Sequence, residues 1–195
     1  RISTSDHAYY STISPKLAPV LEQHPDISIE LSLDNGFRNI VDERFDAGVR
    51  LGESVDKDMI AVRIGPDWRM IVVGSPAYFA ANPPPETPQD LTAHNCMNYR
   101  QRSDAGRYAW EFEKAGRDLR VKVDGQLTFN TSYAMIEAAL RGHGVCFVAE
   151  DAVAEHLAAG QLVQVLDDWC PLFTGYYLYY PSRRQNSAAF GIVLS

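Results

Sequence analysis

The sequence predicts an α/β protein made of two units, with the chain crossing from the first to the second at a proline-rich segment. Apolar and polar residues alternate with the period of a strand over Ile27–Leu33, and helix-like apolar spacing lies on both sides of this segment. Such strand and helix alternation is typical of a parallel sheet. The proline-rich segment 82–88 interrupts the alternation, and a second one follows it. A chain of 195 residues is long enough to bury a core of its own.

The first half is expected to run strand, helix, strand, helix, strand. Hydroxyl and carboxylate side chains at residues 3–6 precede a helical apolar spacing. This helix is expected to restart near Pro15, because proline is tolerated only in a first turn. Asp34–Gly36 has the composition of a turn. A second short helix is then expected over 37–41, leading to a strand at Phe45–Glu53.

The Phe45–Glu53 strand carries Asp46 and Arg50 within an apolar run. Charged side chains inside a sheet rarely lack partners. We therefore expect this strand in the middle of the sheet, where the topology changes and where open α/β sheets bind ligands.

The later elements divide the chain at the proline-rich segment. We assign residues 1–80 plus 175–195 to the first unit and 81–174 to the second. Further strands are expected at 59–64, 68–73, 96–100, 110–113, 121–129, 145–149, 162–166 and 176–180, with helices from 75, 130, 151 and 184. The strand at 176–180 is expected to return to the first unit, so its four tyrosines are interpreted as strand residues instead of an aromatic box.

Composition and motifs exclude several functions. The net charge of −7 argues against a nucleic-acid surface in this segment. No apolar stretch approaches the ~20 residues of a membrane span. The sequence has no Gly-x-Ser-x-Gly, no His-Glu-x-x-His and no glycine-rich phosphate loop, and its five histidines are scattered. We therefore expect no enzyme activity, no metal and no cofactor.

The three cysteines, Cys96, Cys146 and Cys170, show no Cys-x-x-Cys spacing. Reduced thiols in a cytoplasmic protein are the expected state. A Cys96 to Cys170 redox pair is the alternative. The sequence begins at Arg1 without a leader and ends within an apolar run, so we expect a fragment of a longer protein.

Two junctions between a strand and a helix supply candidate ligand-binding residues. Ser5 and Asp6 lie at one, and Asn130, Thr131 and Ser132 lie at the other. Unpaired N–H groups and the dipole at a helix N-terminus favour a carboxylate. The alternative is that these side chains are only N-caps. Because Asp6 would repel a plain anion, an amino-acid-like ligand is also considered.

Arg50 is the candidate cationic partner of the ligand. Its alternative role is an ion pair with Asp46 or another acid. Tyr99 and Arg100 are expected at strand ends of the second unit and complete the candidate site, with solvated surface as their alternative.

Six segments together resemble the effector-binding domain of LysR-type transcriptional regulators, over about Asp26 to Arg184. They are Phe45-Asp46-Ala47-Gly48-Val49-Arg50-Leu51-Gly52, Gly74-Ser75-Pro76-Ala77-Tyr78, Asp90-Leu91 with His94-Asn95-Cys96, Ala138-Ala139-Leu140 with Gly142 and Gly144, Ala159-Gly160-Gln161-Leu162-Val163, and Tyr179-Tyr180-Pro181.

This resemblance implies two Rossmann-like subdomains of periplasmic-binding-protein type II architecture, joined by two crossing strands, with a small-molecule effector bound between them. It also implies a homodimer or tetramer, a cytoplasmic location, and DNA binding only through an upstream winged helix-turn-helix. The Ile27–Leu33 strand is a candidate sheet edge that self-association would cover. A free-standing solute-binding protein of the same fold is the alternative function.

Overall fold

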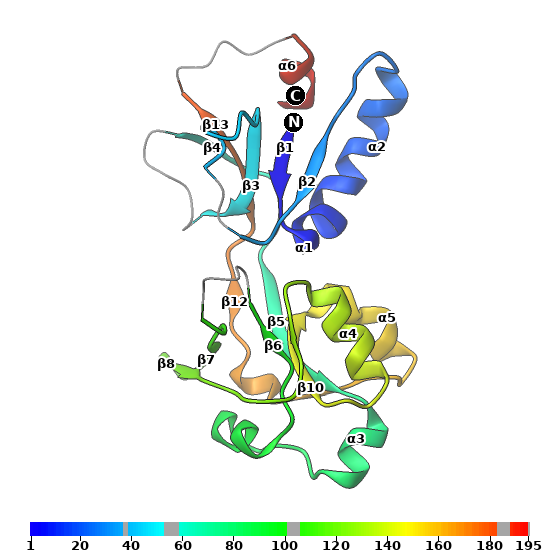
Figure 1. Cartoon of the computed structure of the whole chain (residues 1–195), viewed down its shortest axis with the longest axis vertical. Helices are drawn as coiled ribbons and strands as arrows, with labels where there is room; N and C mark the ends of the chain where they lie inside the picture. Colours follow the sequence, from blue (N-terminus) through cyan, green and yellow to red (C-terminus); the bar gives the residue numbers. More distant parts are fainter. Residues whose placement is uncertain (37–38, 53–58, 101–105, 183–187, 195) are drawn as a thin grey trace. The chain divides into compact units, whose positions relative to one another are not determined.

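A computed structural model describes residues 1–36, 39–52, 59–100, 106–182 and 188–194. The chain forms two compact units: unit 1 is Arg1–Asp67 with Thr174–Ser195, and unit 2 is Trp68–Phe173. The chain therefore crosses between the units twice, after Asp67 and after Phe173 (Figure 1). The first crossing precedes the strand Trp68–Gly74 instead of falling near residue 80, because that strand pairs with later strands of unit 2.

Unit 1 contains a five-stranded sheet in the order β2-β1-β3-β13-β4. Strand β1 is parallel to β2 and β3, whereas β13 is antiparallel to β3 and β4. The central position expected for the strand with Arg50 is confirmed, and the strand at 176–180 does return to this sheet. The strands are β1 Ile2–Thr4, β2 Leu31–Leu33, β3 Ala47–Leu51, β4 Met59–Arg63 and β13 Tyr176–Pro181.

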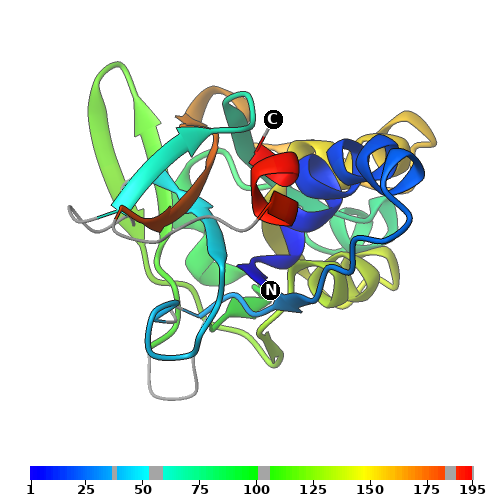
Figure 2. The ribbon, with the colours of Figure 1, turned by 90° about the horizontal axis from the view of Figure 1, so that it is seen from above.

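A continuous helical run follows β1 and comprises α1 (Asp6–Ala8), the π-helical segment η1 (Tyr9–Ile13) and α2 (Ser14–Gln23). The predicted restart near Pro15 is confirmed, because α2 begins at Ser14 with Pro15 in its first turn, and the π-helical η1 joins it to α1. Pro19 lies inside α2, so the expectation that proline is confined to a first turn was wrong there. The C-terminal helix α6 (Ala188–Leu194) packs against α2 (Figure 2).

Two elements of unit 1 differ from the predictions. Strand β2 covers only the last three residues of Ile27–Leu33. The helix expected over 37–41 is absent from the described residues 39–44, which form a turn, and residues 37–38 lie outside the described part. Asn39 Oδ1 accepts hydrogen bonds from the backbone N–H groups of Val41 and Asp42, but Arg44 has a φ of 58°. This left-handed residue ends the turn before a helix can extend.

Unit 2 is built around β5, which pairs antiparallel with β10, β11 and β12. Two small sheets accompany it, the parallel pair β6 and β9 and the hairpin of β7 and β8. The elements are β5 Trp68–Gly74, α3 Pro76–Ala81, η3 Pro88–Ala93, β6 Asn98–Tyr99, β7 Trp110–Lys114, β8 Arg117–Val121, β9 Thr128–Phe129, α4 Ser132–Leu140, β10 Val145–Ala149, α5 Glu150–Ala158, β11 Val163–Val165, η4 Asp167–Trp169 and β12 Leu172–Phe173.

The single strand predicted over 121–129 is instead the end of β8, an irregular stretch and β9. Gly125 lies in that stretch. A Cβ atom at this position would meet the Cys96 carbonyl oxygen at 2.1 Å, so only glycine allows this close approach of two backbones.

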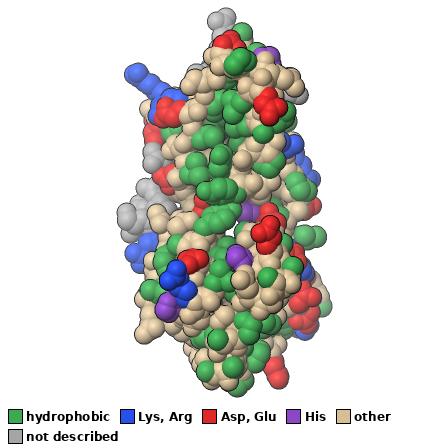
Figure 3. All heavy atoms as spheres, turned by 90° about the vertical axis from the view of Figure 1, so that its right-hand side faces the viewer, with side chains coloured by type: hydrophobic (Ala, Val, Ile, Leu, Met, Phe, Trp, Pro, Cys, Tyr) green, Lys and Arg blue, Asp and Glu red, His purple; other side chains and the backbone are tan. Residues whose placement is uncertain are grey.

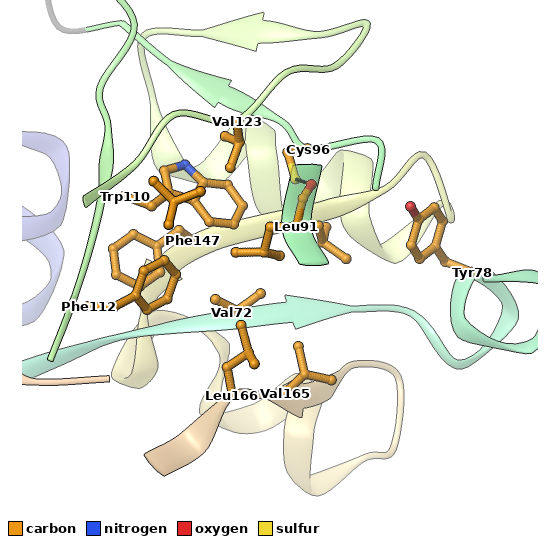
Figure 4. Close-up of a cluster of buried hydrophobic side chains, with 12 residues drawn as sticks. Val72, Tyr78, Leu91, Cys96, Trp110, Phe112, Val123, Phe147, Val165 and Leu166 are labelled. Carbon is orange, nitrogen blue, oxygen red and sulfur yellow. Dashed lines mark hydrogen bonds between the residues drawn. The ribbon is translucent and has the colours of Figure 1, made fainter. Parts of the chain in front are cut away.

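Unit 2 has an apolar cluster on each face of the β5 and β10 strands. On one face, Val72 and Phe147 pack with Trp110 and Phe112, and the Trp110 and Phe147 rings stack at 5.4 Å between centroids (Figure 4). The other cluster contains Ile71, Val73 and Cys146 together with residues of α4 and α5. Successive strand residues therefore face opposite clusters, as the pleat requires.

Among the described residues, no helix is both long enough and apolar enough to cross a membrane.

Candidate functional site

The strands of unit 1 bring polar residues together at one edge of its sheet. Because β1, β2 and β3 are parallel, their carboxyl ends, at Thr4, Leu33 and Leu51, lie at the same edge. Open α/β sheets bind ligands at such edges. The residues that directly follow these strands are thus the first candidates for a site in unit 1.

Ser5 and Asp6 follow β1 and begin the helical run. Ser5 is the N-cap, and its Oγ accepts a hydrogen bond from the Ala8 backbone N–H at 3.2 Å. Asp6 Oδ1 accepts from the His7 backbone N–H at 2.7 Å. Asp6 also donates its own backbone N–H to Asn35 Oδ1, 3.0 Å away. The Ser5 side chain thus performs the capping role that was weighed as the alternative, whereas Asp6 is the first residue of α1. Both side chains remain half-buried at the carboxyl ends of the strands.

Arg50 is 7% exposed and lies next to the end of β3. Its guanidinium donates to the Ser3 hydroxyl at 3.2 Å and to the carbonyl oxygens of Asp34 at 3.0 Å and Gly36 at 3.1 Å. A further bond reaches the carbonyl oxygen of Val49 at 2.7 Å. These bonds join β1 and β3 to the loop that follows β2. Arg50 therefore orders the loop that contains Asn35, at the carboxyl ends of these strands.

His7 and Tyr176 were not identified from the sequence as residues of this group, and Asn35 was not identified as a possible site residue. The buried His7 Nδ1 lies 2.8 Å from the hydroxyl of Tyr176, the first residue of β13. Asn35 was interpreted only as turn chemistry. Its position directly after a parallel strand was the available sign that its amide would face the same edge as Asp6.

In unit 2, the predicted residues also come together at strand ends. Strands β6 and β9 are parallel, with Tyr99 opposite Phe129. The backbone N–H of Arg100 donates to the Phe129 carbonyl at 2.8 Å. The segment Asn130–Ser132 then follows β9 directly, with Thr131 as the N-cap residue of α4. Tyr99 and Arg100 are therefore neighbours of the α4 N-terminus.

Two buried polar atoms mark this part of unit 2. Within the described residues, neither Arg100 Nε nor Asn98 Oδ1 has a hydrogen-bond partner. Asn98 is fully buried, while its amide nitrogen donates to the Cys96 carbonyl at 3.2 Å. Buried polar atoms without partners are uncommon and costly in folded proteins. A polar ligand at these strand ends would supply acceptors to Arg100.

Glu150, another acid at a strand end, has a structural role. Both of its carboxylate oxygens accept hydrogen bonds from Arg69, at 3.1 and 2.8 Å, and Asp167 accepts a third at 2.9 Å. The Glu150 hydrogen bonds raise the pKa of the Arg69 guanidinium. This network ties β5 to the start of α5 and to η4.

The three cysteines are free thiols. Burial raises the pKa of Cys96 to about 12 and that of Cys170 to about 11, and it also raises the pKa of Cys146. Thiols of this kind are poor nucleophiles at neutral pH, because the thiolate is the reactive form. Within the described ranges, no group of three or more His, Cys, Asp or Glu side chains is placed to hold a metal ion.

The fold is that of known regulatory domains. The full-length Vibrio cholerae virulence activator AphB, a member of the LTTR protein family, matches with a TM-score of 0.83 at 23% identity, over 100% of this chain and 65% of that one. The regulatory domain of AphB from Vibrio vulnificus matches with a TM-score of 0.82 at 24% identity, over 99% of this chain and 94% of that one. These likenesses confirm the predicted periplasmic-binding-protein type II architecture.

Sequence similarity identifies the family. The model of the LysR substrate binding domain matches residues 1–193. A putative transcriptional regulator of Pseudomonas aeruginosa is 54% identical over 194 residues, and the HTH-type transcriptional regulator PgrR of Escherichia coli is 41% identical over 194. The chain belongs to the LysR substrate-binding domain family. It spans 63% and 65% of the lengths of these two relatives.

Proposed function

We propose that this chain is the effector-binding half of a LysR-type transcription regulator, which acts on DNA in the cytoplasm through a separate helix-turn-helix and performs no chemistry. The family match supports the binding role, and the names of both relatives support the regulatory one. The alternative of a free-standing solute-binding protein has no comparable support. The net charge of −7 suits a segment that leaves DNA contacts to another domain.

The effector is proposed to be a small carboxylate or an amino-acid-like molecule held by polar groups at the strand ends. The observation that carries this proposal is the buried Arg100 Nε, which has no acceptor within the described part of the chain. The backbone of Arg100 pairs with Phe129, which lies directly before the segment that begins α4. A carboxylate would accept from Arg100 and would be favoured by the dipole at the N-terminus of α4.

Unit 1 would contribute Ser5 and Asp6, with Arg50 ordering the loop beneath them. Asp6 favours a ligand that also carries an amine, because a carboxylate alone would be repelled. Tyr99, Asn130 and Ser132 complete the proposed set of ligand-binding residues.

Calorimetry with a panel of carboxylic acids and amino acids tests the effector site. Arg100→Met and Thr131→Ala should each weaken binding of the responding compound, by about tenfold or more for the charged contact. Arg120→Met is the matched control, because Arg120 is an exposed arginine of the same unit that pairs with Glu111. If a compound binds and both site variants retain the affinity of the control, the effector site lies elsewhere.

Regulation itself requires the full-length protein. DNA binding measured with and without the effector, at one fixed salt concentration, should change when the effector is added. Full-length protein without DNA affinity, or with turnover of a substrate, would contradict the proposed function.

Self-association as a dimer or tetramer is proposed on a surface of unit 1. Strand β2 is a sheet edge, and Leu33 on β2, Leu21 on α2 and Tyr10 on η1 are exposed. On the side where α2 lies in Figure 1, hydrophobic side chains gather over the upper part of the molecule, the region of unit 1 (Figure 3). Sedimentation should show an assembly that Leu21→Glu dissociates, whereas a wild-type monomer at tens of micromolar would contradict it.

A further inference from the structure

An open groove in unit 1 shares no residue with the strand-end group described above. Its volume is about 570 Å³, and its walls come from two segments. Ser11, Thr12 and Lys16 belong to the helical run, whereas Arg63 and Gly65 belong to the end of β4 and the following turn. Both segments lie within unit 1, so the groove is a property of this unit alone.

The helical wall of the groove contains an unusual element. Ser11 and Thr12 belong to η1, a π-helical turn inserted between two α-helical stretches. Such insertions are rare and are found frequently at functional sites. The two hydroxyls lie 3.1 Å apart, and Thr12 is buried while Ser11 is half-buried. The hydrogen bond to Thr12 can therefore hold the Ser11 hydroxyl in place, and this hydroxyl can form a second hydrogen bond with an occupant of the groove.

The charge of the groove is positive. Arg63 donates from Nε to the Gly65 carbonyl at 3.0 Å and from Nη2 to Asp67 at 2.7 Å, so an acid already offsets its charge. Lys16 is exposed and has no hydrogen-bond or ion-pair partner within the described ranges. One uncompensated cation at the rim of the groove favours an anionic occupant.

The walls of the groove lie close together and are partly apolar, so an occupant needs a short apolar part. A Cβ atom on Gly65 would lie 3.2 Å from Thr12 Oγ1 and 3.3 Å from Thr12 Cγ2, so the two walls approach each other closely at this glycine. Pro15, Ile64 and Pro66 supply apolar lining beside the hydroxyls. An occupant that combines one negative group with a short apolar body would satisfy both features.

We propose that this groove is a second ligand site, and that it binds a small organic acid. The carboxylate would pair with Lys16 and accept from Ser11, and the apolar body would lie along Pro15 and Ile64. Asp67 Oδ1 also accepts from the Gly175 backbone N–H at 3.0 Å. The Arg63 wall of the groove therefore belongs to a contact that joins the unit 1 ends of both chain crossings.

Amide chemical-shift mapping of the 195-residue chain with sodium hexanoate tests the site. Hexylamine is the control ligand, because it has the same apolar body and the opposite charge. Lys16→Met removes the proposed cation, and Lys122→Met removes an exposed lysine from unit 2 as the matched protein control. The unbound spectrum of each variant reports whether its fold is retained.

Hexanoate should bind with a dissociation constant of about 1 mM and shift the amides of residues 11–16 and 63–66. Lys16→Met should weaken binding about fivefold, the upper range for an exposed ion pair, while Lys122→Met should not. The proposal is overturned if hexanoate does not bind, if hexylamine binds equally well, if the shifts fall elsewhere, or if both lysine variants behave alike. None of these results bears on the strand-end site, whose test uses other residues.

Discussion

Arg50 offers the most direct test of how the strand edge of unit 1 is held together. The Arg50→Met change keeps much of the side-chain length but removes every donor. It leaves the carbonyl oxygens of Val49, Asp34 and Gly36, and the Ser3 hydroxyl, without the bonds of 2.7 to 3.2 Å that the guanidinium supplies. The methionine itself is tolerated in a buried position.

The expected loss of stability follows from these bonds. A hydrogen bond to a charged group contributes about 1.5–3 kcal/mol, and abandoned buried acceptors cost about 1–3 kcal/mol each. Removing a buried charge offsets part of this loss. We therefore expect a net loss of about 3 kcal/mol in the free energy of unfolding, which lowers the melting temperature by about 6–12 °C for a chain of this size.

The positions of the tryptophans allow the unfolding of the two units to be followed separately. Trp68, Trp110 and Trp169 all belong to unit 2, so their fluorescence follows that unit, whereas circular dichroism follows both. Arg50→Met should shift the dichroism transition in urea more than the fluorescence transition if the units unfold separately. Arg120→Met, at an exposed ion pair, should change stability by less than about 1 kcal/mol. A loss of that small size for Arg50→Met would refute the structural role.

Three further predictions concern unit 2. The folded chain should react with a thiol reagent at pH 8 far more slowly than the unfolded chain, because burial raises the pKa of Cys96 to about 12 and that of Cys170 to about 11; rapid reaction of the folded chain would contradict this burial. Burial lowers the pKa of His94, so the unfolded state binds more protons and the stability of the folded chain should fall as the pH drops below about 6.5. Melting temperatures measured across that range should fall less steeply for His94→Gln than for the wild type. An equal fall in both proteins would exclude His94 as the cause. Ser75 Oγ caps α3 by accepting from the Tyr78 N–H at 3.2 Å, so Ser75→Ala should cost about 1 kcal/mol in urea unfolding, whereas an unchanged midpoint would show the cap to be dispensable.

The parts of the fold that sequence predicted best are those where one pattern decides the structure. The buried run at Val145–Ala149 and the Ser75-Pro76 helix start are examples, because burial and capping act locally. The helix expected over 37–41 failed for a tertiary reason. The backbone N–H of Phe45 bonds to the Ile40 carbonyl at 2.8 Å around a left-handed Arg44, and this closure into β3 replaces helical extension.

Candidate site residues were harder to assign because residue type does not determine role. Ser5 and Thr131 were treated alike in the sequence, yet Ser5 Oγ accepts a cap hydrogen bond and Thr131 does not. Arg50 and Arg100 both lie near strand ends. The former has neutral oxygens around its guanidinium, whereas Arg100 Nε lacks an acceptor within the described residues. The acceptors of Arg50 come from the loop after β2, and the sequence pattern does not show that this loop folds over the end of β3.

The contact near the crossings suggests how binding in unit 1 would reach the rest of the chain. Gly175 lies so close to the first crossing segment that a Cβ atom would meet the Gly65 carbonyl oxygen at 2.2 Å. The two segments therefore meet backbone to backbone, and Asp67 fastens them by accepting from both Arg63 and Gly175. A ligand changes the balance between two conformations only by its differential affinity for them. The proposed acid pairs with Lys16 and Ser11 beside Arg63, so it would bias the crossings only if its affinity differed between conformations in which Arg63 bonds to Asp67 and conformations in which it does not.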